Sequence, residues 1–217
     1  MITRRIFTAS LGAWTLAACT AQNPSPQIAA IQPRMLLPDT PEPYPVAAVD
    51  LSTIDRQFWR QIVPDPTGEP PGTIVVDPDA RFLWLVMEGG RAMRYGVGVG
   101  REGFAWNGAA TIPRKAQWPK WTPPQEMIAR EPDLQKWAGG MPGGPDNPLG
   151  ARALYLYQNG RDTLYRIHGT SEPWSIGKSV SSGCIRLLNV EVIDLHRRVP
   201  TGTRVVVRPS SGGAHSA

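Results

Sequence analysis

The sequence is poor in the residues that most often build metal sites and disulfides. Its 217 residues include only two cysteines and three histidines, and these lack the close paired spacing that zinc ligands show. It also lacks any run of lysine and arginine interleaved with aromatic residues, which would be typical of a nucleic-acid-binding surface. We therefore expect no metal, no cofactor and no nucleic-acid partner.

Acidic residues are absent before Asp39, and the apolar run near the N-terminus is too short to span a bilayer comfortably. Arg4 and Arg5 precede this run, which ends in Leu16-Ala17-Ala18-Cys19. The layout is typical of a secretory signal, with a retained anchor helix as the alternative. Its end resembles the bacterial lipobox, which implies that Cys19 is lipidated, and Thr3-Arg4-Arg5-Ile6-Phe7 resembles a twin-arginine export signal.

These features predict an exported protein on the periplasmic side, held to a membrane by a lipid on Cys19. Residues 1–18 form the predicted signal peptide, and their removal takes two arginines from the formal charge of +5 and leaves +3. The uncharged Thr20 favours the outer membrane if the host has two membranes. Residues 19–45 are predicted to form a Pro-rich tether, residues 46–209 the folded domain and residues 210–217 a flexible tail.

The folded region is predicted to be mainly β. Asn159-Gly160 lies between two apolar stretches and favours a hairpin with a type I′ turn. A late helix is predicted to begin with Asn189 as its cap and to stop at Pro200. A short helix is expected within residues 50–63, where apolar residues recur near helical spacing. The predicted strands are residues 73–76, 82–86, 92–99, 153–157, 163–167 and 203–207.

Residues 101–147 read as a long irregular segment rich in Trp, Pro and Gly. One short helix is predicted there, over residues 124–130. Such a segment inside a compact domain is usually a lid or a binding loop. The alternative is a satellite apolar cluster that only covers the sheet, because tryptophans also fill cores.

The candidate for covalent chemistry lies in residues 167–187. His168 directly follows a predicted strand, and Cys184 follows a turn rich in Gly and Ser. A cysteine attacks as its thiolate, and a histidine is well suited to remove the thiol proton near neutral pH. Each residue taken singly is more often structural, whereas the combination indicates a nucleophile and its base.

Residues next to the cysteine add two further functions. The N–H groups of Ser182, Gly183 and Cys184 can point at a substrate carbonyl oxygen and stabilise its developing charge. Arg186 can hold a substrate carboxylate through a bidentate contact, although such arginines more often pair with a surface acid.

His168-Gly169-Thr170, followed by Ser181-Ser182-Gly183-Cys184-Ile185-Arg186, resembles the signature of the L,D-transpeptidases, the YkuD-like catalytic domain. The sixteen-residue step from His168 to Cys184 falls within that family's spacing. Residues 146–151, 172–177 and 189–195 are similar too, and the resemblance covers roughly residues 73–207. Ser182 stands where many members carry His, and either residue supplies the same backbone N–H.

The resemblance implies a sandwich-like β domain and a cysteine acyltransferase that acts on peptidoglycan. Cys184 would attack the third residue of a stem peptide, release the terminal D-alanine and hold the acyl group as a thioester. An amine of a neighbouring stem would resolve it, or a protein lysine would, which attaches that protein to the wall. By the same resemblance His168 moves the proton and the Gly169 carbonyl orients it. The expected substrate-binding residues are Thr170, Trp174, Ser181 and Arg186.

Two alternatives remain at this point. Water in place of the amine would make the protein an L,D-carboxypeptidase or hydrolase with the same nucleophile. A catalytically silent lipoprotein that binds the wall is the other, and the presence of both His168 and Cys184 argues against it.

Overall fold

The computed structural model describes residues 35–36, 38, 41–100, 106–181 and 183–210. Nine strands form one sheet in the order β12-β10-β9-β8-β13-β4-β5-β6-β3. Two neighbouring pairs, β10 with β12 and β13 with β4, are parallel, and the other pairs are antiparallel. The predicted mainly β, sandwich-like fold is confirmed.

The strands of this sheet are β3 (Gln61–Pro64), β4 (Ile74–Asp77), β5 (Phe82–Met87), β6 (Arg91–Gly96), β8 (Gly108–Gln117), β9 (Arg152–Gln158), β10 (Arg161–His168), β12 (Ile185–Arg186) and β13 (Arg204–Val207). Two small sheets pair β1 (Met35–Leu36) with β2 (Val49–Asp50) and β7 (Val99–Gly100) with β11 (Ser179–Ser181). The helices are α1 (Gln125–Arg130) and α2 (Asn189–Arg198), with 3₁₀ turns η1 (Leu51–Thr53), η2 (Arg56–Phe58), η3 (Pro132–Trp137) and η4 (Pro173–Ser175).

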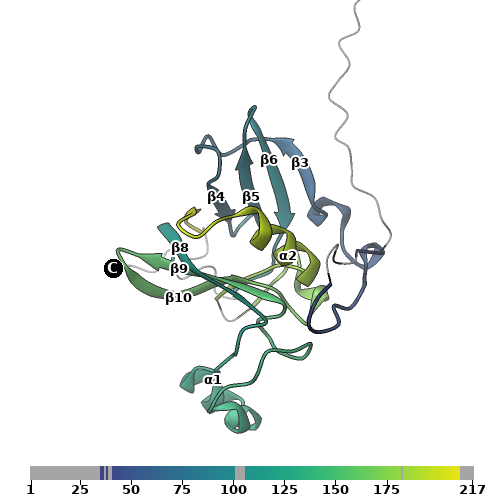
Figure 1. The fold of residues 1–217 in the computed structure, drawn as a ribbon, viewed down its shortest axis with the longest axis vertical. Coiled ribbons are helices and arrows are strands. Elements are labelled where there is room, and N and C mark those ends of the chain that lie inside the picture. The colour runs from purple at the N-terminus through teal and green to yellow at the C-terminus, as the bar shows by residue number, and fades with distance from the viewer. Residues whose placement is uncertain (1–34, 37, 39–40, 101–105, 182, 211–217) are drawn as a thin grey trace, which may run out of the picture.

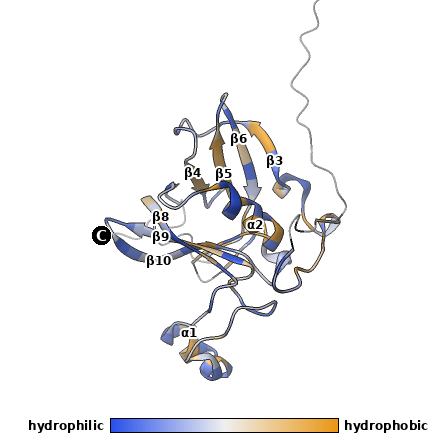
Figure 2. Ribbon diagram, in the orientation of Figure 1, coloured by the Kyte–Doolittle hydropathy of each residue, from blue (hydrophilic) through white to orange (hydrophobic). Residues whose placement is uncertain are grey.

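The large sheet bends into two halves with α2 between them (Figure 1). One core joins buried side chains of β4–β6, of β8–β10 and of α2, among them Ile74, Tyr95, Leu154 and Leu195. Figure 2 shows that β4 and β5 are largely apolar, whereas the tip of the β9–β10 hairpin is hydrophilic. Within the described ranges, no helix is both long and apolar enough to cross a membrane.

The hairpin and the late helix confirm two local predictions. Asn159 and Gly160 have φ of 51° and 74°, the positive values that a type I′ turn requires. The helix α2 begins at Asn189 as predicted, but the capping role was wrong. Leu188 is the N-cap and has no side-chain cap, while the Asn189 amide oxygen accepts a hydrogen bond from the Ala151 N–H at 2.9 Å.

The helix expected within residues 50–63 was wrong. Asp50 and Asp55 each accept a hydrogen bond from a backbone N–H two residues later, which closes the separate turns η1 and η2. Ile62 then pairs with Met93 at the edge of the sheet. The apolar residues that suggested one helix therefore belong to two short turns and a strand.

The prediction that residues 101–147 are irregular was wrong for residues 108–117, which form β8. The helix predicted over residues 124–130 is confirmed as α1. β8 was missed because its register shifts between Thr111 and Arg114, which breaks the alternation of buried and exposed residues. The remaining excursion, residues 118–150, carries α1 and η3 and projects from the end of β8 (Figure 1).

The described end of the predicted tether packs against the domain. The Glu42 carboxylate accepts hydrogen bonds from the Arg152 guanidinium at 2.5 and 2.9 Å and from the Trp118 indole at 2.9 Å. The Tyr44 ring meets the Trp118 ring edge-on at 5.0 Å. Glu42 and Tyr44 therefore pack against the domain, and Met35–Leu36, earlier in the same segment, pairs with β2.

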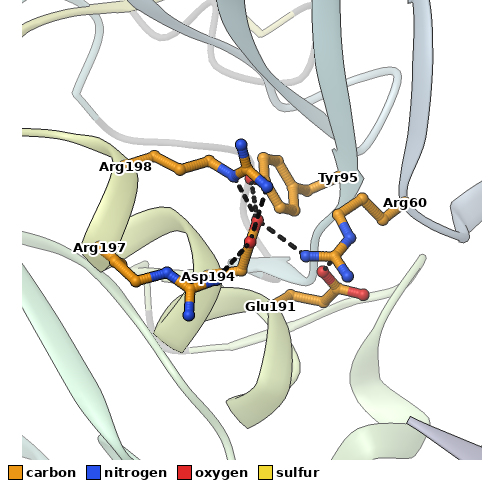
Figure 3. A network of polar contacts seen from close by, with 6 residues as sticks. All are labelled: Arg60, Tyr95, Glu191, Asp194, Arg197 and Arg198. Carbon is orange, nitrogen blue, oxygen red and sulfur yellow. Dashed lines mark hydrogen bonds and ion pairs between the residues drawn. The ribbon is translucent and has the colours of Figure 1, made fainter. Parts of the chain in front are cut away.

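A buried cluster of charged side chains ties α2 to β6 and to the segment before β3 (Figure 3). The Asp194 carboxylate accepts hydrogen bonds from the Tyr95 hydroxyl at 2.7 Å and from the Arg198 guanidinium at 2.8 and 2.9 Å. Arg60 lies 2.8 Å from Asp194 and 3.3 Å from Glu191. Burial alone would raise the pKa of Asp194, but these hydrogen bonds and the charge of Arg60 lower it to about 2.

We predict that Asp194→Ala destabilises the protein by about 3–5 kcal/mol, because it removes the acceptor of the buried Tyr95 hydroxyl and one of the two carboxylates that face Arg60. Urea unfolding followed by circular dichroism measures this loss. The exposed Asp133 supplies the matched control, and Asp133→Ala should change the free energy of unfolding by less than about 0.5 kcal/mol. Equal stabilities of the two variants would show that the cluster contributes nothing.

Candidate active site

His168 ends β10 and is 4% exposed. Its Nδ1 lies 2.6 Å from the carbonyl oxygen of Gly169. A carbonyl only accepts, so Nδ1 carries the proton and Nε2 keeps a lone pair. Burial, and then the charges of Arg186 and Arg166, lower the pKa of His168 to about 4, although the bond to Gly169 opposes this shift. The imidazole is therefore neutral at pH 7 and has the tautomer of a base.

Asn189, which was predicted to cap α2, instead supports this arrangement from the start of that helix. A Cβ atom built on Gly169 would lie 2.2 Å from the Asn189 amide oxygen, and one built on Gly150 would meet the same atom at the same distance. Two glycines are thus required for the chain to pass this side chain. Asn189 holds the backbone at Ala151, next to the carbonyl that orients His168.

Cys184 lies on the same face of the sheet as His168. The parallel register pairs Ile167 with Ile185 and His168 with Arg186, and both isoleucines are fully buried in the core. Because side chains alternate along a strand, Arg186 points to the opposite face, together with His168. Cys184 directly precedes β12, and a backbone hydrogen bond from Arg166 places it one strand away from β10 and two residues from the level of His168. At the usual strand spacing and rise, this diagonal corresponds to about 8 Å between Cα atoms, which the two side chains can bridge.

The thiol is neutral in the resting site. Burial raises the pKa of Cys184, while a backbone hydrogen bond from Arg166 and the charges of Arg166 and Arg186 oppose the rise. A raised pKa on the thiol and a lowered pKa on the imidazole disfavour a standing thiolate–imidazolium pair. The arrangement suits a base that removes the proton as the bond to the substrate forms.

Gly183 gives the turn before Cys184 its shape. Its φ is 118°, a conformation that other residues rarely adopt, and a Cβ atom there would lie 3.4 Å from the Tyr165 ring. Ser181 ends β11, which pairs in parallel with β7. Ser182, predicted to supply an oxyanion N–H, lies outside the described residues, as does the predicted lipidation site Cys19.

The predicted substrate-binding residues fall into two environments. Arg186 forms an ion pair with Glu172 at 2.7 Å, and Trp174 is 53% exposed with the Lys178 ammonium 5.3 Å from its ring centre. Thr170 is buried instead, and its hydroxyl accepts a hydrogen bond from the Glu172 N–H at 3.0 Å. Thr170 thus braces the turn after His168, while Arg186 and Trp174 lie closer to solvent.

The excursion of residues 118–150 is fixed at its base. The buried Asn147 amide donates hydrogen bonds to the carbonyls of Pro119 and Pro142 at 3.0 and 2.9 Å. Trp118 is 8% exposed and packs in a small cluster with Ala151. Trp118 therefore fits the alternative of a satellite apolar cluster, whereas α1 lies farther out (Figure 1).

No group of three or more His, Cys, Asp or Glu that could hold a metal ion occurs among the residues that the structure describes. Arg166, whose backbone is hydrogen-bonded to Cys184, was not predicted from the sequence. Its only signal was its place two residues before His168 on a predicted strand.

Residues 71–207 match the YkuD family, described as the L,D-transpeptidase catalytic domain. The chain is 36% identical over 161 residues to the Probable L,D-transpeptidase ErfK/SrfK of Escherichia coli (strain K12), covering 71% of this chain and 48% of that protein. It is 35% identical over 147 residues to the Probable L,D-transpeptidase YbiS of the same strain, covering 66% and 46%. The chain thus spans about half the length of these relatives.

Among solved structures, the chain is similar to one titled "Crystal structure of a Probable carnitine operon oxidoreductase caia from Brucella melitensis". The identity is 51%, the TM-score is 0.50, and the match covers 73% of this chain and 99% of the other. A Putative L,D-transpeptidase of Fuscovulum blasticum is 36% identical over 160 residues, covering 73% of this chain and 79% of that protein. The chain therefore belongs to the family of the YkuD-type L,D-transpeptidase catalytic domain.

Proposed function

We propose that the chain is a peptidoglycan L,D-transpeptidase that works through a thioester on Cys184. The observation that carries the proposal is the shared face of β10 and β12, where a thiol lies diagonally from an imidazole whose Nδ1 is bonded to the Gly169 carbonyl. That bond leaves Nε2 as the atom that accepts a proton. Family membership supports the same reaction class.

In the acylation step, His168 Nε2 takes the thiol proton as Sγ attacks the carbonyl of the third residue of a stem tetrapeptide. The N–H groups of Ser182, Gly183 and Cys184 stabilise the oxyanion that forms. When the tetrahedral intermediate collapses, the C–N bond to the terminal D-alanine breaks and His168 returns the proton to the leaving amine. The acyl group remains on Cys184 as a thioester.

In the second step, an amine of a neighbouring stem attacks the thioester and His168 removes its surplus proton. The proton passes to the departing sulfur, which restores the Cys184 thiol and leaves a link between two third residues. A lysine of a protein acceptor would attach that protein to the wall by the same chemistry. Arg186 helps to place the substrate through its guanidinium.

The proposal includes a place for the enzyme. A signal over residues 1–18 and a lipid on Cys19 would export it and hold it at a membrane that faces the wall. The mature domain would then meet stem peptides on the periplasmic side. The alternatives are hydrolysis, in which water resolves the thioester, and a silent domain that binds the wall without turnover.

Residues 20–217 are expected to convert disaccharide-tetrapeptide to a dimer that has lost one D-alanine, and Cys184→Ala should abolish this product because the thioester no longer forms. Mass spectrometry measures the products directly. Free tripeptide without dimer would identify water as the acceptor and a carboxypeptidase. Turnover retained in Cys184→Ala would exclude the mechanism, and a well-folded protein that never reacts would indicate the silent binder.

We expect His168→Ala to slow acylation of Cys184 by a penem roughly 10²–10⁴-fold, the usual effect of losing a general base. Stopped-flow fluorescence or mass spectrometry measures the rate. The circular dichroism spectrum of each variant provides the control for folding.

The pH dependence of acylation in the unchanged protein should follow His168. Because the pKa of His168 is lowered to about 4, the rate should hold as pH falls through 6.5 and drop only as Nε2 becomes protonated near pH 4. The pKa of His196 is also lowered to about 4, by burial and by Lys115 and Arg152. His196→Gln should leave the profile unchanged, and an acid limb centred at pH 6.5 would contradict the burial argument.

A further inference from the structure

A row of four residues crosses the sheet from the nucleophile. The registers pair Arg166 with Tyr155 and Tyr155 with Arg114, and a backbone hydrogen bond joins Arg166 to Cys184. Residues directly opposite each other in paired strands share a face. Leu154 and Leu156 flank Tyr155 and are fully buried in the core, so the row lies on the face away from that core, with the nucleophile.

Tyr155 lies between two guanidinium groups. The Arg114 Cζ is 4.2 Å and the Arg166 Cζ is 4.5 Å from the centre of its ring, which is within the range of cation–π contacts. The tyrosine itself is 7% exposed, so the stack is a packed element of this face. It holds both arginines in fixed planes, which reduces the entropy lost when either one binds a ligand.

The two arginines differ in their partners. Arg166 is engaged by Asp162, with its two terminal nitrogens 2.6 and 2.8 Å from the two carboxylate oxygens. Arg114 is exposed and forms no ion pair with a residue that the structure describes. Of the two stacked guanidinium groups, only that of Arg166 is paired with a carboxylate, and the planar donor fork of Arg114 remains available to an anion.

The distance from the nucleophile limits which anion can bind there. Adjacent strands lie about 4.8 Å apart, so Tyr155 is about 10 Å and Arg114 about 14 Å from Cys184 across the sheet. The guanidinium of Arg114 lies over Tyr155, at the nearer distance. Two extended residues cover about 7 Å of that span, and a side chain that carries the carboxylate covers the rest. The carboxylate of the departing D-alanine is only one residue from the scissile bond, which is too short a distance for it to reach the Arg114 guanidinium.

We propose that Arg114, stacked on Tyr155 and backed by Arg166, is a subsite for a carboxylate in the acyl part of the donor stem peptide. This inference rests on the proposed function, since a stem tetrapeptide places three residues on the acyl side of the scissile bond. It makes Arg114 a specificity residue that distinguishes stems with a free carboxylate on the second residue from stems in which that group is an amide.

The test measures binding to Cys184→Ala, in which turnover cannot obscure affinity. The probes are two synthetic tetrapeptides that end in D-alanine and differ only at the second residue, with its carboxylate free or amidated. Acetylation of the third residue's side-chain amine prevents either peptide from acting as an acceptor. Calorimetry should give about tenfold tighter binding of the free carboxylate, because a charge-assisted bidentate contact is lost in the amide.

Adding Arg114→Gln should reduce this tenfold preference to less than about twofold, and so should 1 M salt, which screens an exposed pair. The matched control is Arg91→Gln, since Arg91 is an exposed arginine on the other half of the sheet, and it should keep the preference. Arg114→Lys should keep only part of it, because lysine retains the charge but loses the planar fork.

Each outcome separates the subsite from the proposed function. Equal affinity for the two peptides, a preference that survives Arg114→Gln, or no binding of either peptide would overturn the subsite. Release of D-alanine by the unchanged enzyme tests the proposed function by itself. A preference that depends on Arg114, without any release of D-alanine, would keep the subsite and reject the transpeptidase.

Discussion

The parallel pairing of β10 with β12 is the contact on which the candidate active site depends. It sets Ile167 beside Ile185 and His168 beside Arg186, and the alternation of side chains then separates their environments. The isoleucines enter the core, while the imidazole, the thiol and the arginine share the other face. A shift of one residue in this register would place Cys184 in the core. Two segments sixteen residues apart are thus made into one site by backbone hydrogen bonds.

Burial gives this pair its chemical character. The same exclusion of water that lowers the pKa of His168 to about 4 raises the pKa of Cys184, so both groups are uncharged at rest. Hydrogen bonds therefore fix the geometry of the site: the Gly169 carbonyl orients the imidazole, and Asn189 positions the backbone beside it. In the proposed mechanism, charge develops only when a substrate is attacked, and the arginines and backbone N–H groups of this face would stabilise it.

Much of this arrangement could be predicted from the sequence, where local signals agreed with the fold. The Asn159-Gly160 turn and the apolar stripe of α2 needed only their own residues, and the motif around His168 and Cys184 needed only its spacing. The predictions that were wrong or missing concern residues whose partners are far away in the sequence. The alternation of β8 is interrupted by a register shift. Asn189 accepts a hydrogen bond from the distant Ala151 N–H instead of capping its own helix. Arg166 lies beside Cys184 only because a neighbouring segment is placed next to its strand. No local pattern carries such information.

The contact of Glu42 with Arg152 and Trp118 has a mechanical consequence. Trp118 follows the last residue of β8 and Arg152 is the first residue of β9, so Glu42 is fastened where these two strands meet. Tension from the N-terminal side would meet first the pairing of β1 with β2 and then this contact, which would load the β8–β9 pair near the middle of one half of the sheet. The strands β10 and β12 lie beyond it and would carry little of that force. The Glu42 contact would thus take up a pull from the N-terminal side before it reached β10 and β12, and the distance between the thiol and the imidazole would not change.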